Sequence, residues 1–210
     1  AKYLPGISHL EAEASYIRLG SDAALKPASG TISIWVKLDR ISYSGQGYGC
    51  NPIILATNTR TPEAPFEGYA LYLQMEGRRA YATTVEPVEM LQATAYGQAA
   101  VANTWRHYVM TYDRRELKLY EDGALVRTVA KSYGSSGIFS NDPVFVGSSM
   151  NESNDRAFNG AVDDIRIYNR VLNGSEITAL FQEQATAPVI YAELKEVMDA
   201  GFYAVPSGTS

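Results

Sequence analysis

The sequence predicts an all-β domain, a two-sheet antiparallel sandwich of the jelly-roll type with a short helix after its last strand. Three observations support this prediction. Short runs of apolar and β-branched residues recur between clusters of Gly, Pro and charged residues. One run, 31–38, has the pattern of a strand covered on both faces. Another, 158–170, is extended and passes directly into a helical pattern.

The strands follow from this alternation. Residues 10–19 alternate and end at a Gly-Ser-Asp turn. In the run 31–38 four aliphatic side chains share one face and Trp35 lies on the other, so we expect a central strand covered on both sides. Further strands are expected at 53–57, 69–76, 80–85 and 90–96, from Trp105 and from Leu117 onward, and at 125–130 and 144–147.

The last strand and the helix after it lie within residues 158–181. Alternation predicts that four side chains share one side of the strand: Ala161, Asp163, Ile165 and Ile167. The acid among them needs a partner if that side is buried. Residues 173–175 supply a turn, and Glu176 suits the first turn of a helix. Helical spacing then places three apolar side chains on one stripe: Ile177, Leu180 and Phe181.

Four segments, in order along the chain, resemble laminin-G-like domains of the concanavalin A-like lectin and glucanase superfamily. The segment F-N-G-A-V-D-D-I-R-I-Y-N-R at 158–170 matches nearly all of the family's closing motif. T-I-S-I-W-V-K at 31–37 resembles its early central strand. W-R-H-Y-V-M-T-Y-D at 105–113 and L-K-L-Y-E-D-G at 117–123 resemble its hairpin. The resemblance covers residues 10–181 and implies a concanavalin A-like jelly roll.

The composition is that of a folded domain. The chain has 210 residues, of which 46% are hydrophobic, enough for a buried core. Its net charge of −5 and its scattered Lys and Arg argue against nucleic acid or an anionic membrane as a partner and favour neutral or cationic ligands. The single cysteine, Cys50, cannot form an internal disulfide. No apolar run has membrane-spanning length, and the first ten residues lack the layout of a signal peptide.

The sequence divides into two parts. Residues 1–184 are predicted to form the jelly-roll domain. Residues 185–210 contain a Thr-Ala-Pro linker and an amphipathic helix, whose apolar stripe is Ile190, Leu194, Val197 and Met198. The last residues, Pro206–Ser210, have the composition of an inter-domain linker, so we expect a further domain in a larger multidomain protein.

Patterns that carry catalysis are missing from the sequence. Retaining glycosidases place two carboxylates about 5 Å apart, and the superfamily's hydrolases carry them in a Glu-x-Asp-x-Glu type motif, but no Glu-x-Asp triplet occurs here. Glu11 and Glu13 share a strand face without a third acid in register. His107 faces the same way as Trp105 and is expected to be a hydrogen-bonded core imidazole. Two histidines and one cysteine make a tetrahedral zinc site implausible.

The resemblance also implies a structural calcium ion. In that superfamily the aspartate of the closing strand is a ligand, and Asp163 matches it. Ca²⁺ prefers carboxylate oxygens, and Glu11 could supply a second ligand. The first strand has Glu13-Ala-Ser-Tyr16 where the family has an acidic pattern. A second interpretation therefore stays open, in which Asp163 accepts hydrogen bonds from backbone amides near a strand end.

Loop residues are the candidates for glycan binding. Sugar rings stack on tyrosine or tryptophan, while amides, carboxylates and guanidinium groups bind hydroxyls. Trp35 and Trp105 lie in the segments that carry the resemblance and are assigned to the structure. The candidate ligand-binding residues are Tyr43, Tyr48, Arg60, Asn151, Asn154 and Arg156.

The resemblance implies a non-catalytic polysaccharide-binding module of a secreted, periplasmic or cell-surface bacterial protein, with a role in polysaccharide utilisation. Two alternatives stay open: a glycoside hydrolase of the same superfamily, and a structural or protein-adhesion module. A glycan array separates the binding module from the adhesion module. Activity on polysaccharide, compared with Glu11→Gln and Glu13→Gln, tests the hydrolase.

Overall fold

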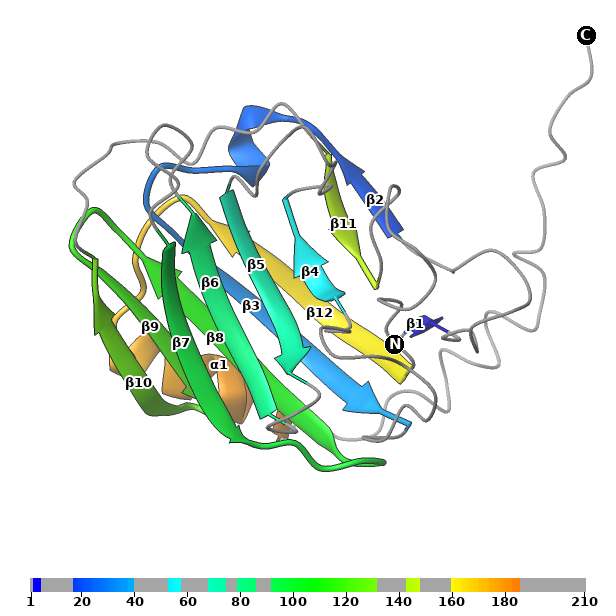
Figure 1. The fold of residues 1–210 in the computed structure, drawn as a ribbon. Helices are drawn as coiled ribbons and strands as arrows, with labels where there is room; N and C mark the ends of the chain where they lie inside the picture. Colours follow the sequence, from blue (N-terminus) through cyan, green and yellow to red (C-terminus); the bar gives the residue numbers. More distant parts are fainter. Residues whose placement is uncertain are drawn as a thin grey trace, which may run out of the picture.

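A computed structural model of the chain describes residues 2–4, 17–39, 53–57, 68–74, 79–85, 92–131, 143–147 and 160–185. Within these ranges the chain forms two six-stranded antiparallel sheets (Figure 1). Sheet A runs in the order β1 (Lys2–Leu4), β12 (Gly160–Tyr168), β3 (Gly30–Leu38), β8 (Trp105–Tyr112), β9 (Glu116–Glu121) and β10 (Ala124–Ala130). Sheet B runs in the order β2 (Ile17–Gly20), β11 (Val144–Val146), β4 (Ile53–Ala56), β5 (Gly68–Gln74), β6 (Arg79–Val85) and β7 (Gln92–Ala99).

The two sheets pack face to face, and two helices complete the described chain. Sheet B lies in front of sheet A in Figure 1, and the helix α1 (Gly174–Ala185) lies behind sheet A. A 3-10 helix, η1 (Ala23–Leu25), connects β2 to β3. This arrangement confirms the predicted all-β sandwich with a short helix after the last strand. The predicted tail helix and linker lie outside the described residues.

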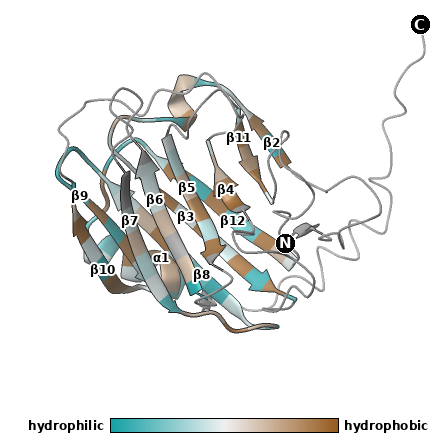
Figure 2. Ribbon diagram, in the orientation of Figure 1, coloured by the Kyte–Doolittle hydropathy of each residue, from teal (hydrophilic) through white to brown (hydrophobic). Residues whose placement is uncertain are grey.

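The core lies between the sheets and is built from alternate residues of both. Hydrophobic stretches colour strands of both sheets brown in Figure 2. From β3, the four predicted aliphatic residues are all buried in this core: Ile32, Ile34, Val36 and Leu38. The alternate residues of β3 face away from the core; of these, Thr31 and Ser33 are buried, and Trp35 stacks on Phe181 of α1. The prediction of a central strand covered on both sides is therefore confirmed.

The closing strand β12 contains a bulge that the sequence pattern did not predict. Asp163 pairs with Trp35 and Arg166 pairs with Ser33, so β12 has one more residue than β3 between these pairs. Asp164 has a φ of 45°, and its backbone N–H donates to Asp163 Oδ1 at 2.9 Å. The extra residue changes the side to which the following side chains point.

The prediction that four alternating residues of β12 share one side is therefore wrong. Ile165 and Ile167 pack against the core. Asp163 lies opposite Trp35, on the outer face of sheet A. A single inserted residue reverses the alternation because side chains of a strand alternate with a period of two.

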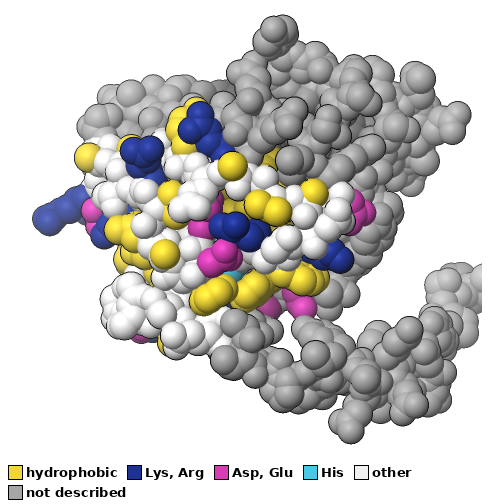
Figure 3. All heavy atoms as spheres, turned by 90° about the horizontal axis from the view of Figure 1, so that it is seen from below, with side chains coloured by type: hydrophobic (Ala, Val, Ile, Leu, Met, Phe, Trp, Pro, Cys, Tyr) yellow, Lys and Arg dark blue, Asp and Glu magenta, His cyan; other side chains and the backbone are white. Residues whose placement is uncertain are grey.

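Helix α1 packs on the outer face of sheet A through apolar and aromatic side chains. Leu172 and Ile177 are buried against Val109 and Tyr120. The Phe181 ring stacks on Trp35, with 5.6 Å between ring centroids and 14° between planes. Seen from below, apolar side chains gather beside the histidine (Figure 3). The predicted apolar stripe of the helix is thus the stripe that docks on the sandwich.

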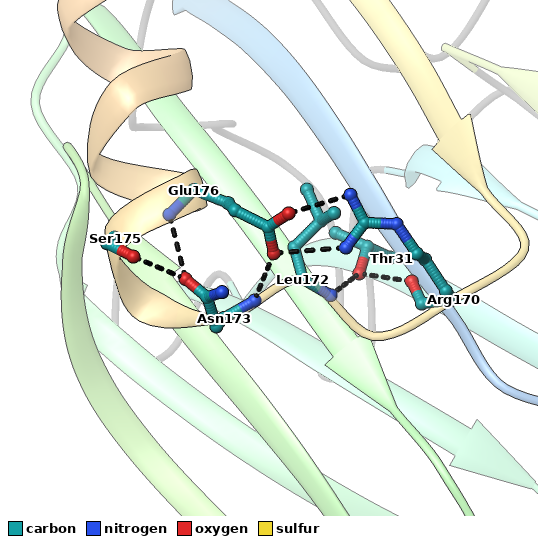
Figure 4. A network of polar contacts seen from close by, with 6 residues as sticks. All are labelled: Thr31, Arg170, Leu172, Asn173, Ser175 and Glu176. Atoms are coloured by element: carbon teal, nitrogen blue, oxygen red, sulfur yellow. Dashed lines mark hydrogen bonds and ion pairs between the residues drawn. The ribbon is translucent and has the colours of Figure 1, made fainter.

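The start of α1 is fixed by a network of polar contacts (Figure 4). Asn173 Oδ1 accepts from the backbone N–H of Glu176 at 3.0 Å, and the Glu176 carboxylate accepts from the backbone N–H of Asn173 at 2.8 Å. This reciprocal pair is a capping box. Arg170 donates to both oxygens of the same carboxylate, at 2.7 and 3.0 Å. Thr31 joins the network to β3, because its hydroxyl donates to Arg170 O and accepts from Leu172 N.

A tight turn between β9 and β10 supports the other end of α1. Asp122 and Gly123 have φ values of 50° and 78°, as in a type I′ hairpin turn. A Cβ atom on Gly123 would lie 3.1 Å from Phe181 Cβ. Thr178 Oγ1 donates to Gly123 O at 3.1 Å. Gly123 is therefore required both by its backbone conformation and by the contact with Phe181.

We expect Gly123→Ala to lower the free energy of unfolding by about 2 kcal/mol, because the left-handed backbone costs about 1–2 kcal/mol for a residue with a Cβ and Phe181 must also shift. The measurement is urea unfolding monitored by fluorescence.

Two other glycines serve as matched controls. Gly20 has a φ of 99° and no atom within 4 Å of an added Cβ, so Gly20→Ala reports the backbone cost alone. Gly174, in the first turn of α1, also has open space, so Gly174→Ala should not destabilise. Equal effects of the Gly123 and Gly20 substitutions would contradict the contribution from Phe181.

Candidate functional site

The outer face of sheet A is occupied by a stack of rings beneath α1. The His107 ring lies 5.1 Å from Trp35 and 6.2 Å from Phe181, nearly parallel to both. Its Nε2 is 2.8 Å from Ser33 Oγ, and the residue is only 1% exposed. The predictions that His107 is a hydrogen-bonded core imidazole and that Trp35 has a structural role are confirmed. Trp105, which was also assigned to the structure, is 36% exposed at the start of β8.

Burial lowers the pKa of His107. Removal from water lowers the pKa of its imidazole to about 4, despite the nearby carboxylates of Asp122 and Asp164, which raise it. Among the described residues, no hydrogen-bond partner reaches His107 Nδ1 or Trp35 Nε1, although both atoms are buried. A neutral, enclosed imidazole of this kind supports packing and does not meet a substrate.

We expect the protein to lose stability as the pH falls from about 6.5 to 4 because His107 must be protonated. The folded-state pKa lies below the unfolded value, so the contribution is complete above about pH 6.5 and is lost as the pH falls through about 4. This difference in pKa corresponds to about 3 kcal/mol. The measurement is the unfolding free energy of the wild type and of His107→Gln across this range. The difference between the two proteins should shrink at low pH, and parallel curves would contradict the assignment.

Two adjacent acids at one end of the sandwich, Glu121 and Asp122, form hydrogen bonds and ion pairs with neighbouring strands. Glu121, 4% exposed, accepts from Gln98 N at 3.0 Å and lies 3.4 Å from Arg106. Its burial raises the pKa of the carboxyl. A Cβ on Gly97 would come within 2.0 Å of Glu121 Oε1, so β7 needs a glycine there. Asp122 pairs with Arg106 at 2.8 Å. Glu121 thereby joins β7 to sheet A, whereas Asp122, which also accepts from His107 N at 2.9 Å, bonds groups of β8 within sheet A.

The outer face of sheet B combines an aromatic ring, hydroxyls and a guanidinium group. Thr83 pairs with Thr94 across β6 and β7, with their hydroxyl oxygens 3.2 Å apart. Two residues along β7, Tyr96 lies on the same face and is 37% exposed. The Arg79 guanidinium lies over the Tyr96 ring, 4.9 Å from its centroid. Such a combination can stack on a sugar ring and bind its oxygens.

The accessible part of this face is at its β6–β7 end. Ala56, Ala70 and Tyr72 form a separate cluster on the outer side of β4 and β5, and each is at most 4% exposed. Thr94 and Arg79 are partly exposed, and Tyr96 is exposed. Thr83 is only 3% exposed, so we define the Tyr96 platform as Arg79, Thr94 and Tyr96.

Most of the residues predicted to bind ligands cannot be placed. Tyr43, Tyr48, Arg60, Asn151, Asn154 and Arg156, together with Glu11, lie outside the described residues. Among the predicted site residues, the structure describes Asp163, which lies on the outer face of sheet A. Its carboxylate accepts from a backbone amide, as the second interpretation expected. Within the described ranges, no group of three or more potential metal ligands occurs, and calcium binding by Asp163 with Glu11 stays a prediction.

The Tyr96 platform was missed because its parts are distant in sequence. Arg79 and Tyr96 lie near each other because β6 and β7 pair antiparallel in a register that places Tyr96 opposite Tyr81, two residues along β6 from Arg79. The spacing of Thr94 and Tyr96, two residues apart, is enough to predict that both side chains lie on the same face of β7. Arg79, its neighbour on β6, can be identified only when the register between β6 and β7 is known.

The fold and the platform together define a lectin-like β-sandwich. A family model described as the concanavalin A-like lectin/glucanases superfamily, of laminin G type, matches residues 11–178. The chain belongs to this family. The resemblance of the four sequence segments is thereby confirmed. No curated protein matches the sequence.

Solved structures support the same fold. The CBM40 module of the Ruminococcus gnavus IT-sialidase, bound to α2,3-sialyllactose, has a TM-score of 0.63 at 19% identity, over 84% of this chain and 96% of that one. Domain 4 of AbnA, a GH43 extracellular arabinanase from Geobacillus stearothermophilus, in complex with arabinotriose, has a TM-score of 0.56 at 18% identity, over 85% and 74%. The binding domain of Paraclostridial Mosquitocidal Protein 1 has a TM-score of 0.64 at 18% identity, over 83% and 42%.

At such identities the likeness concerns the fold. The chain spans 42% of the length of the mosquitocidal binding domain and nearly all of the CBM40 module. In the part of the chain that the structure describes, no helix has the length and apolar character needed to cross a bilayer.

Proposed function

We propose that the chain is a non-catalytic polysaccharide-binding module and that glycan binds at the Tyr96 platform. The observation that carries this proposal is the exposed Tyr96 ring beside Arg79 and the partly exposed Thr94, on a sheet that no described helix covers. An exposed aromatic ring next to polar side chains is the usual composition of a sugar-binding surface.

Two further observations support the proposal. Structures of similar fold include modules solved with sialyllactose and with arabinotriose. The described strands of sheet B contain no Asp or Glu, so they offer no carboxylate pair of the kind that hydrolyses a glycosidic bond. We also propose an extracellular or cell-surface location, because polysaccharide is met there. The predicted loop residues remain candidates for additional contacts.

We expect Tyr96→Ala to weaken polysaccharide binding by about 5- to 150-fold, since loss of a stacked ring costs about 1–3 kcal/mol in comparable stacking interactions. Binding is measured by a glycan array followed by calorimetry on the glycans that score.

Trp105 provides the control. It is 36% exposed against 37% for Tyr96, but it lies on sheet A. Trp105→Ala should therefore leave binding unchanged, provided its melting temperature shows that it is folded. Loss of binding in Trp105→Ala alone would move the site to the other sheet. Absence of binding to every glycan would favour the adhesion module, and release of sugars would favour the hydrolase.

We also propose that Asp163, with Glu11, binds calcium. Asp163 Oδ1 already accepts from the amide of Asp164, and a carboxylate can use its other lone pairs toward Ca²⁺. In this interpretation calcium would stabilise the bulge in β12.

If calcium binds, a hundredfold excess over its Kd should stabilise the folded chain by about 2.7 kcal/mol, and chelator should reverse the rise in Tm. Asp163→Asn should abolish the rise. Glu183→Gln is the control, because Glu183 is an exposed acid bound to Arg166. A Tm that does not change with calcium, or that still rises in Asp163→Asn, would contradict this proposal.

A further inference from the structure

Charge is distributed unequally between the two sheets. The whole chain has a net charge of −5. The described strands of sheet B nevertheless contain two arginines, Arg18 and Arg79, and no Asp or Glu. The net charge of the chain, which favoured neutral or cationic ligands, therefore does not describe this face. A ligand at the Tyr96 platform meets positive charge on the strands themselves.

On the opposite side of the sandwich, acids are matched by arginines. Asp164 and Glu183 both bind Arg166, at 2.8 and 2.9 Å. Glu176 binds Arg170 through both carboxylate oxygens. Carboxylates of Asp164, Glu176 and Glu183 thus bind arginines on their own side of the sandwich, whereas the described strands of sheet B contain arginine and no acidic residue. This asymmetry gives the two faces different ligand preferences.

Arg79 is held in a defined position on the platform. Its guanidinium lies 4.9 Å from the centre of the Tyr96 ring, an arrangement stabilised by the negative face of the ring. A guanidinium that is already ordered loses less conformational entropy when a ligand binds. Its planar donor edge matches the two oxygens of a carboxylate, which a point charge does not. The hydroxyl of Thr94, which is partly exposed, follows along β7 and suits a neutral sugar oxygen.

We propose that the Tyr96 platform selects acidic glycans, and that Arg79 recognises a sugar carboxylate. This inference rests on the proposed function and names its ligand class. Two arginines on one sheet do not make the dense basic surface that nucleic acid or an anionic membrane requires. A glycan with spaced carboxylates needs only one well-placed guanidinium at a time.

The test uses pairs of glycans that differ only in the acidic group. One pair is sialyllactose and lactose, and the other is an oligogalacturonate and its methyl ester. Calorimetry at low and high salt should show that the acidic member binds at least about tenfold more tightly at low salt, with the advantage reduced by salt. Equal affinity within both pairs would overturn the inference and leave the proposed function intact. Absence of binding to all four, together with a negative glycan array, would overturn both.

Three arginine substitutions test whether Arg79 is the residue that recognises the sugar carboxylate. Arg79→Gln should remove the preference for the acidic member while the neutral member still binds. Arg79→Lys keeps the charge but loses the planar fork, so it should recover only part of the preference. Arg18→Gln removes the same charge from β2. Because β2 lies four strands from β6, at about 4.8 Å per strand the two arginines are roughly 20 Å apart. Arg18→Gln should therefore bind like the wild type. If Arg18→Gln and Arg79→Gln have the same effect, general electrostatic attraction is responsible and the assignment to Arg79 is wrong.

Discussion

The packing of Phe181 onto Trp35 and His107 holds α1 against the outer face of sheet A. The three rings occupy the outer face of sheet A together with the buried Leu172 and Ile177 of the helical segment. Burial of this much aromatic surface makes α1 an integral layer of the domain. Because this layer covers sheet A, the corresponding face of sheet B is the one that no described helix covers. The proposed glycan site and the helix that stabilises the sandwich therefore lie on opposite sides of it.

The polar contacts support the same division. The network of Asn173, Glu176, Arg170 and Thr31 starts the helix where its apolar stripe meets the sheet. At the other end of the sandwich, Glu121 connects β7 to β8 and β9 through Gln98 and Arg106. Glu121 is 4% exposed, and a buried carboxylate is costly unless it is paired, so its bonds to Gln98 and Arg106 stabilise the contact between these strands.

The comparisons fit this view of a stable scaffold with an adaptable surface. Three domains whose sequences are 18–19% identical to this chain have the same sandwich fold. Two of them were solved with different glycans, sialyllactose and arabinotriose. Fold is maintained by the alternation of core residues, whereas outward-facing positions can change without loss of packing. A platform such as Arg79 with Tyr96 belongs to these outward-facing positions.

Much of the fold could be predicted from the sequence, but little of the candidate site. Aliphatic alternation in 31–38 and the closing segment with its helix were sufficient for the all-β sandwich, since burial of apolar faces acts locally along each strand. The outward position of Asp163 depended on a bulge, and the pairing of Arg79 with Tyr96 depended on the register between β6 and β7.

The sequence by itself thus determined the layers of this protein and the residues that fill its core. Only the tertiary structure decided which polar side chains meet on a surface. The physical reason is that hydrophobic periodicity is a property of one strand, whereas register, bulges and helix docking are set by contacts between elements that are far apart in the chain.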